Sequence, residues 1–229
     1  MNIEQYNVAV GGGSEYYMEL EILADRNRDD GNYIMAMENY NKVLQNAQSD
    51  VVKQRVTKEL NHVTFLAYKK AAEKALENKD FATAADYFAD ANSLLSSTLT
   101  IDEKIATKMV RDIVTANKGA GEKAFQNKDF ATATKYFAEA HRHAEEDENI
   151  ANLLRKTMVE FHKINANVAL REKKYIDAEE DLEQALKFAP GDSEITGLLA
   201  DVKKEMGAEG GYRKRTNKRS NKRRTKRTF

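Results

Sequence analysis

A seven-residue segment occurs twice in this sequence, and its repetition constrains the fold more than any other feature. Residues 78–84 read Asn-Lys-Asp-Phe-Ala-Thr-Ala, and the same letters return 49 residues later at 127–133. Two weaker copies flank this pair, so four aromatic residues recur at spacings of 48, 49 and 45 residues: Tyr33, Phe81, Phe130 and Tyr175. Repeats of this length are typical of stacked helical pairs.

The residues after each aromatic anchor predict an amphipathic helix. Offsets of three and four residues place side chains on one helical face. The positions three, seven and ten residues after the anchors hold Ala36, Ala84, Ala133 and Ala178, then Tyr40, Phe88, Phe137 and Leu182, then Val43, Ala91, Ala140 and Ala185. Before each anchor runs a second helical pattern, whose small residues let two helix backbones approach closely: Ala24, Ala72, Gly121 and Ala166. A short polar turn joins the two helices, and we expect Asp80 to cap the helix that follows it.

This arrangement resembles the tetratricopeptide repeat (TPR), in which a first helix, a tight turn and a second helix with spaced Ala and aromatic residues form one unit. Four units cover about residues 15–48, 50–96, 101–146 and 148–191. The first helix of that family carries Trp where this chain has Leu20, Tyr68, Asn117 and His162, and only the last unit keeps the closing proline, Pro190. The resemblance implies an all-α fold, a right-handed superhelical stack of about four helix hairpins (an α-solenoid).

The units are longer than the usual 34 residues of that family. The extra residues precede each first helix and keep helical spacing, as in the series Val52, Val56 and Leu60. We therefore predict long first helices of about 25 residues that alternate with short second helices of about 15. A separate short third helix in each unit is the alternative.

The two ends of the chain differ from the repeats. Residues 1–13 are expected to form a flexible lead before the repeat domain at 14–191. Residues 192–206 predict a capping helix, because stacked repeats need an element that covers the last apolar face. Residues 207–229 read as a glycine-hinged, disordered basic tail.

The charge of the chain is divided unevenly. The 37 basic and 37 acidic residues balance, but ten basic residues lie in the tail, which leaves 27 basic and 37 acidic side chains elsewhere. We expect the tail to bind nucleic acid or another polyanion by displacing condensed counterions. A nuclear import signal and docking on an acidic protein surface are the alternatives. The basic residues are Arg213, Lys214, Arg215, Lys218, Arg219, Lys222, Arg223, Arg224, Lys226 and Arg227.

In the TPR family the first helices line a concave surface that holds a peptide. Carried over to this sequence, the inward positions are Lys69, Glu73 and Leu76, then Lys118, Glu122 and Phe125, then Lys163, Asn167 and Leu170. Lysine recurs at one place in three consecutive units, which favours acidic side chains or a terminal carboxylate as ligand. The alternative is that Lys69–Glu73 and Lys118–Glu122 are surface ion pairs within one helix, worth about 0.2–0.5 kcal/mol each.

No catalytic pattern is visible. The chain has no cysteine, which removes disulfide scaffolds, thiolate metal sites and cysteine nucleophiles. His141 and His143 lie two residues apart, so a helix points them in different directions, and we expect His162 to pack in the core. We therefore predict no metal and no cofactor, and regard an enzyme as a distant alternative.

The sequence thus predicts a non-catalytic scaffold that binds a protein or peptide in its groove and a polyanion through its tail. No apolar run approaches the roughly 18 residues of a membrane span, and the N-terminus has no secretory signal. We expect an intracellular protein, cytoplasmic or nuclear and not secreted. A self-assembling structural protein, whose basic tail docks on the acidic body of a second copy as a homo-oligomer, is the second hypothesis.

Overall fold

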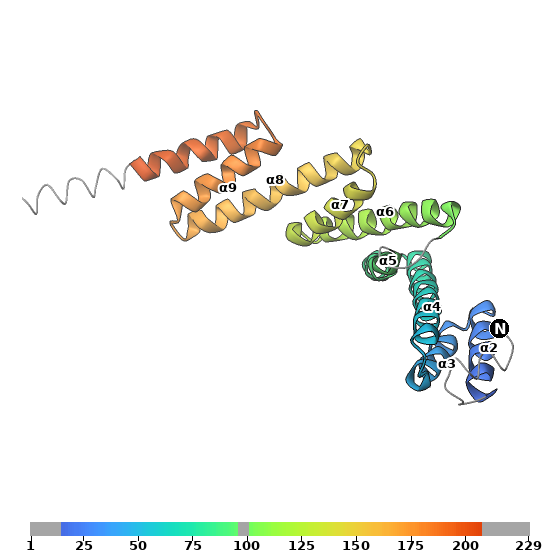
Figure 1. Ribbon diagram of the computed structural model, residues 1–229. Coiled ribbons are helices and arrows are strands. Elements are labelled where there is room, and N and C mark those ends of the chain that lie inside the picture. Colours follow the sequence, from blue (N-terminus) through green and yellow to red (C-terminus); the bar gives the residue numbers. More distant parts are fainter. Residues whose placement is uncertain (1–14, 96–100, 208–229) are drawn as a thin grey trace, which may run out of the picture. The chain divides into compact units, whose positions relative to one another are not determined.

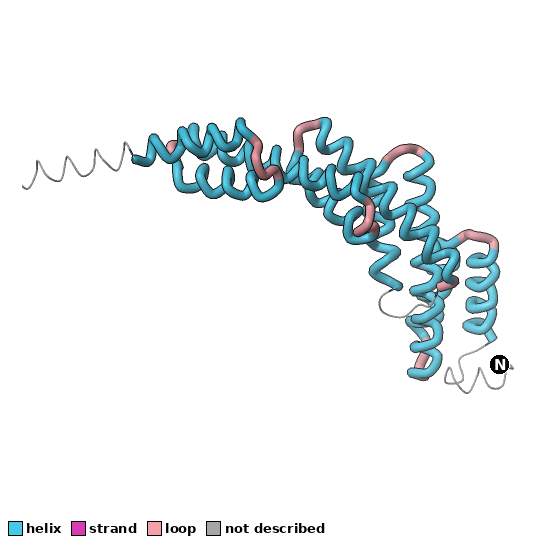
Figure 2. The backbone as a smooth tube through the Cα atoms, turned by 90° about the horizontal axis from the view of Figure 1, so that it is seen from above, coloured by secondary structure: helices cyan, strands magenta, loops and turns pink. Residues whose placement is uncertain are grey.

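The computed structural model describes residues 15–95 and 101–207, and in these residues it contains helices and no strand (Figures 1 and 2). The helices are α2 (Glu15–Asp29), α3 (Tyr33–Asn46), α4 (Asp50–Glu77), α5 (Phe81–Leu95), α6 (Glu103–Gln126), α7 (Phe130–His143), α8 (Glu148–Arg171) and α9 (Tyr175–Phe188). A further helical segment spans residues 193–207. The predicted all-α fold is confirmed for this part of the chain.

The second helix of each hairpin begins at one of the four aromatic anchors. Helices α3, α5, α7 and α9 are 14, 15, 14 and 14 residues long. The long helices α4, α6 and α8 have 28, 24 and 24 residues. The predicted alternation is confirmed from α3 to α9, where the extra residues continue into the long helix. In the first unit the predicted length is wrong, because its first helix α2 has only 15 residues. The alternative of a separate third helix is wrong.

The same turn joins the two helices of every hairpin. One residue of each turn has a positive φ, namely Gly31 (74°), Lys79 (57°), Lys128 (61°) and Lys173 (57°). In the second hairpin, Lys79 N–H donates to the Leu76 carbonyl and Asp80 N–H to the Ala75 carbonyl, both at 2.9 Å. The other three turns repeat this pair of bonds, which satisfies the carbonyls left open where a helix ends. Three lysines therefore occupy a left-handed conformation that favours glycine.

Aspartates cap several helices, as the sequence predicts. Asp80 accepts a hydrogen bond from Thr83 N–H at 3.4 Å, and Asp129 accepts the equivalent bond from Thr132 N–H at 3.1 Å. Asp147 caps α8 through two backbone N–H groups. Asp192 does the same for the segment 193–207 at 2.9 and 3.1 Å. The carboxylates thus satisfy N–H groups that a helix start leaves without a partner.

Close approach of the two helices in a hairpin depends on the small residues of the long helix. Ala24 and Ala72 are fully buried. At Gly121 an added Cβ would lie 2.8 Å from the Phe137 ring, so the α6 backbone rests directly on that ring. The predicted close contact is confirmed at this position, where any side chain would overlap the aromatic residue.

The chain divides into two compact units, residues up to Ala120 and residues from Gly121 onwards, and the division falls inside α6. In the first unit α2 packs on α3, α3 on α4, and α4 on α5. In the second unit α7 packs on α8 and α8 on α9. Neighbours along the chain are thus the main packing partners (Figure 1).

Each unit has an apolar core built from the repeated positions. In the first unit, Tyr40 and Val43 are buried together with Val52 and Val56 from the start of α4. In the second unit, Ile195 and Val202 of the segment 193–207 pack against Leu182 of α9. The segment predicted as a capping helix therefore contributes two buried side chains to the core that it covers.

Candidate binding surfaces

The first group of predicted groove residues forms an ion network in the first unit. Lys69 donates to Glu73 at 2.9 Å, so this pair on α4 has the spacing expected of a pair within one helix. Glu73 also accepts a hydrogen bond from Lys108 of α6, and Lys108 pairs with Asp112 at 2.7 Å. Leu76 is half-buried on the same helix. The Lys69 ammonium therefore already has a carboxylate partner.

The Glu73 carboxylate is held in its charged form. Burial alone would raise its pKa, but hydrogen bonds from Lys108 and Lys69 outweigh burial and keep the pKa below its ordinary value. The same network raises the pKa of Lys108, first through Asp112 and then through Glu73. This side of α4 is thus neutralised by contacts within the unit.

The other groove candidates have separate surroundings. Among the described residues, no carboxylate pairs with Lys118, and Glu122 is exposed. Phe125 meets Phe130 edge-on at 5.0 Å, and the Lys156 ammonium lies 5.2 Å from its ring centroid. Lys118 belongs to the first unit, and the last five candidates belong to the second.

In the second unit, the lysine of the last repeat also has a partner. Lys163 donates to Glu194 at 2.7 Å, and this bond raises its pKa. Asn167 is exposed, whereas Leu170 packs against the core around Leu182. Two of the three repeated lysines, Lys69 and Lys163, are thus paired with carboxylates of their own unit.

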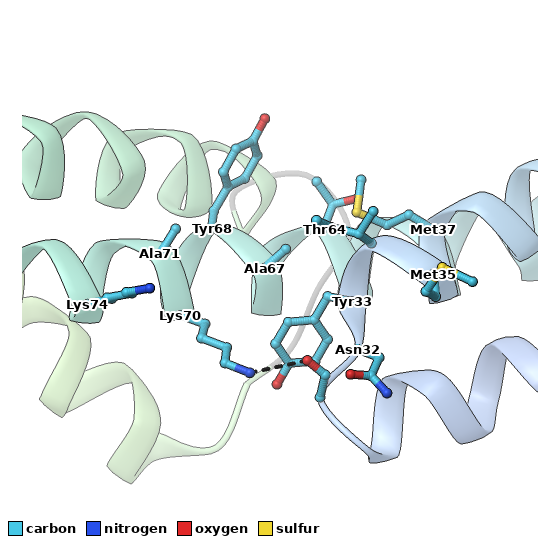
Figure 3. A pocket seen from close by; sticks show the side chains of 12 residues that line it. Asn32, Tyr33, Met35, Met37, Thr64, Ala67, Tyr68, Lys70, Ala71 and Lys74 are labelled. Carbon is cyan, nitrogen blue, oxygen red and sulfur yellow. Dashed lines mark hydrogen bonds between the residues drawn. The ribbon is translucent and has the colours of Figure 1, made fainter.

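A pocket that the sequence does not predict lies in the first unit, between the start of α3 and the second half of α4 (Figure 3). Its volume is about 610 Å³, within the range of ligand pockets of about 300–1,000 Å³. Two of its residues, Ile34 and Met35, are 73% and 51% exposed. The pocket is lined by Gly31, Asn32, Tyr33, Ile34, Met35, Met37, Thr64, Ala67, Tyr68, Lys70, Ala71 and Lys74.

Two lysines one turn apart on α4 line this pocket. The Lys70 ammonium donates to the Gly31 carbonyl at 3.2 Å and lies 5.3 Å from the centroid of the Tyr33 ring. Figure 3 shows Lys70 directed toward Tyr33 and Lys74 one turn further along the helix. In the described part of the chain neither lysine pairs with a carboxylate, and both are exposed. The pocket therefore combines an apolar lining with two uncompensated positive charges.

One feature of the sequence distinguishes this pocket in retrospect. The first anchor is followed by Ile34 and Met35, whereas Phe81 and Phe130 are each followed by Ala-Thr. Large apolar residues at these positions are exposed on the first hairpin and are not needed for its core. Ile34 has an equivalent in Ile176, which is 70% exposed on the fourth hairpin, so Met35 is the residue of this pair that departs from the other three units.

A polar cluster joins the first hairpin to α4 and was not predicted from the sequence. The Tyr40 hydroxyl donates to Asp25, and Arg28 donates to Glu59 at 3.0 Å. Burial, and then the hydrogen bond to Asp25, raise the pKa of Tyr40. Glu21 of α2 is likewise buried and forms an ion pair with Arg55 of α4. These groups satisfy each other across α2, α3 and α4.

Two of the histidines, His143 and His162, pair with carboxylates. His162 Nδ1 lies 2.9 Å from Asp181, and the ring stacks on Phe188 with centroids 6.3 Å apart. Its side chain is 17% exposed, which agrees with the predicted packing role. His143 lies 3.2 Å from Glu139. Within the residues described, no group of three or more His, Cys, Asp or Glu side chains could hold a metal ion.

The predicted tail contacts fall outside the described residues, as does the lead at residues 1–13. Over the described ranges, no helix combines the length and the apolar character needed to cross a membrane. No known protein family matches the chain. No curated protein has a similar sequence.

Proposed function

We propose that this chain is a non-catalytic interaction scaffold of TPR-like hairpins, stacked as a right-handed superhelix, that binds a peptide segment of a partner protein. The observation that carries the proposal is the pocket of about 610 Å³ between α3 and α4 with Ile34 and Met35 exposed beside it. An exposed apolar surface of this kind is typical of a binding site, because without a ligand it favours aggregation. The repeat supports the proposal, because stacked helical hairpins present extended binding surfaces.

Selection from a library of random peptides tests this function. Phage-displayed peptides of 12 residues, as the probe, are selected on the full chain after depletion on the variant Ala67→Phe. This substitution places a ring in the pocket, so depletion removes peptides that bind elsewhere. Enrichment of a common motif supports a peptide-binding pocket. A selection that enriches no motif contradicts it.

The basic residues at 213–227 add a second part to the proposed function, the binding of nucleic acid or another polyanion. If six to ten of these charges contact phosphates, affinity for a random single-stranded DNA should fall about 10³–10⁵-fold between 50 and 200 mM salt. Deletion of residues 212–229 should abolish this binding in an anisotropy titration. Binding that persists after the deletion would refute the role of the tail.

The same deletion tests self-assembly through the tail. If the tail docks on the acidic body of another copy, the deleted chain should sediment as a monomer where the full chain forms oligomers, in the absence of nucleic acid. The proposed scaffold predicts the same sedimentation for both chains.

A further inference from the structure

The residues that line the α3–α4 pocket indicate which kind of ligand it can bind. Its interior is built from Tyr33, Met37 and Ala67 together with the apolar faces of their neighbours. A large apolar side chain of a ligand would leave water on entering it. Full burial of one Leu or Phe side chain is worth about tenfold or more in affinity.

The charges beside the pocket select the ligand further. The Lys70 ammonium contacts a backbone carbonyl and an aromatic ring, and among the described residues the Lys74 ammonium has no carboxylate partner. Lys69, the neighbour of Lys70 on α4, already has a carboxylate. The two lysines of the pocket can therefore bind an anionic group of a ligand, such as a carboxylate.

The chain's own basic residues at 213–227 do not fit this position, because ten like charges would meet two lysines. We infer that the occupant is an acidic peptide segment of a partner protein, which places one large apolar side chain in the pocket and a carboxylate on Lys70 and Lys74. This inference rests on the proposed function and specifies the partner class for its pocket.

Direct binding of defined peptides tests the inference on the full chain. The probe is a dye-labelled peptide Ser-Glu-Asp-Leu-Glu-Asp-Ser, measured by fluorescence anisotropy. A peptide with Ala for Leu should bind about tenfold more weakly or worse, and a peptide with Lys for every acidic residue should bind more weakly still. Equal binding of the acidic and the lysine peptides would overturn the inference.

Variants of the chain locate the binding. Ala67→Phe fills the pocket and should reduce affinity at least tenfold. Lys74→Glu should reduce it about three- to tenfold. Lys58→Glu is the matched control, since Lys58 is exposed on the same helix, about 24 Å away at 1.5 Å per residue, and makes the same change of charge. An affinity that is unchanged by Ala67→Phe, or reduced equally by Lys58→Glu and Lys74→Glu, overturns the inference.

Two further measurements cover failure of a variant to fold and binding to the tail. Ile34→Ser changes an exposed side chain, so it should fold and still reduce affinity about threefold or more. A peptide with benzoylphenylalanine in place of Leu should crosslink to Met35 or Met37 on irradiation, because both line the pocket. Crosslinks confined to residues 208–229 overturn the inference.

The outcomes separate this inference from the proposed function. If peptide selection enriches a motif without acidic residues, the peptide-binding function stands and the acidic partner is wrong. If the full chain dimerises in sedimentation and Ala67→Phe abolishes the dimer, a second copy occupies the pocket, and the inference is overturned.

Discussion

The first unit contains two junctions of the same kind that are built differently. In each, the anchor of a short helix meets the long helix that follows, Tyr33 against α4 and Phe81 against α6. Lys70 and Gly119 lie 49 residues apart and occupy corresponding places in these long helices. An added Cβ at Gly119 would lie 2.5 Å from the Phe81 ring, so that ring rests on the backbone of α6. The Tyr33 ring instead lies beneath the Lys70 ammonium.

The difference shows how a repeat acquires a site. Glycine lets the aromatic ring fill the junction, whereas a lysine side chain takes the same place and the α3–α4 pocket lies beside it. The residues that recur in every unit build the hairpins. Met35 and Lys70, which depart from the repeat, line the pocket.

The largest effect is expected when Gly119 at the Phe81–α6 junction is replaced by the lysine that occupies the corresponding place at the Tyr33–α4 junction. Gly119→Lys places a side chain where the Phe81 ring lies. Overpacking costs about 1–3 kcal/mol, and the gain in helix propensity returns about 1 kcal/mol. We expect a net loss of up to about 2 kcal/mol in the free energy of unfolding, measured by urea denaturation.

Gly197→Lys is the matched control. Gly197 lies in the helical segment 193–207, and an added Cβ there meets no atom within 4 Å. This substitution should therefore stabilise the chain by about 0.5–1 kcal/mol through helix propensity. Similar losses at Gly119 and Gly197 would show that the ring does not rest on α6.

A second comparison concerns the turns, where the first hairpin has Gly31 and the next three have lysine. Lys79→Gly should stabilise the chain by about 0.5–1 kcal/mol, because glycine adopts a positive φ without steric cost. Gly31→Lys should destabilise it by about 1 kcal/mol. Thermal unfolding measures both, and Lys58→Gly inside α4 should lose about 1 kcal/mol. A loss at Lys79 as large as at Lys58 would contradict the left-handed turn.

A smaller effect on stability is expected at the junction of Tyr33 with α4. Lys70→Ala removes the ammonium from the Tyr33 ring and from the Gly31 carbonyl, which should cost about 0.5–1 kcal/mol. Lys74→Ala removes an exposed lysine without a described partner and should change stability by less than about 0.5 kcal/mol. Urea denaturation of the two variants distinguishes them. Equal effects would mean that Lys70 does not support Tyr33.

The smallest effect on stability is expected for Glu73, and its dependence on pH should distinguish the ion network of Glu73 from the contacts of Lys70 on the same helix. Because the pKa of Glu73 is lowered in the folded chain, its contribution is complete above the ordinary carboxyl value of 4.5 and is lost as the pH falls below it. Glu73→Gln should therefore cost about 0.5 kcal/mol at pH 7 and progressively less as the pH falls below 4.5. The cost of Lys70→Ala should not change over this pH range, since its contacts are a backbone carbonyl and the face of an aromatic ring and include no carboxylate. A pH-independent cost of Glu73→Gln would exclude the ion network.

The sequence predicted the hairpins well, because periodic patterns determine them. The second helix of each hairpin begins at its predicted anchor, and the extra apolar residues such as Val52 and Val56 belong to the long helix. Gly121 was predicted as a close contact from its alignment with Ala72, and the Phe137 ring lies there. These features depend on the spacing of residues within one unit, and the sequence alone gives that spacing.

The candidate site was harder to predict from the sequence. The groove positions follow from the TPR resemblance, and the spacing within one helix offered the pairing of Lys69 with Glu73 as the alternative, which the structure has. The pairing of Lys163 with Glu194 instead depends on a neighbouring helical segment. The α3–α4 pocket needs contacts between residues more than 30 positions apart, such as Gly31 and Lys70. The polar cluster of Tyr40, Asp25 and Arg28 likewise joins two helices. No spacing rule connects such residues before the helices are placed.

Packing mainly between neighbours along the chain has a consequence for how this protein loses its structure. Where each hairpin is supported chiefly by the hairpins beside it, stability is close to a sum of local terms, and the ends can open while the middle persists. Hydrogen exchange should therefore report a gradient of opening free energies along the chain. A ligand held between α3 and α4 would slow exchange most in the helices that touch it.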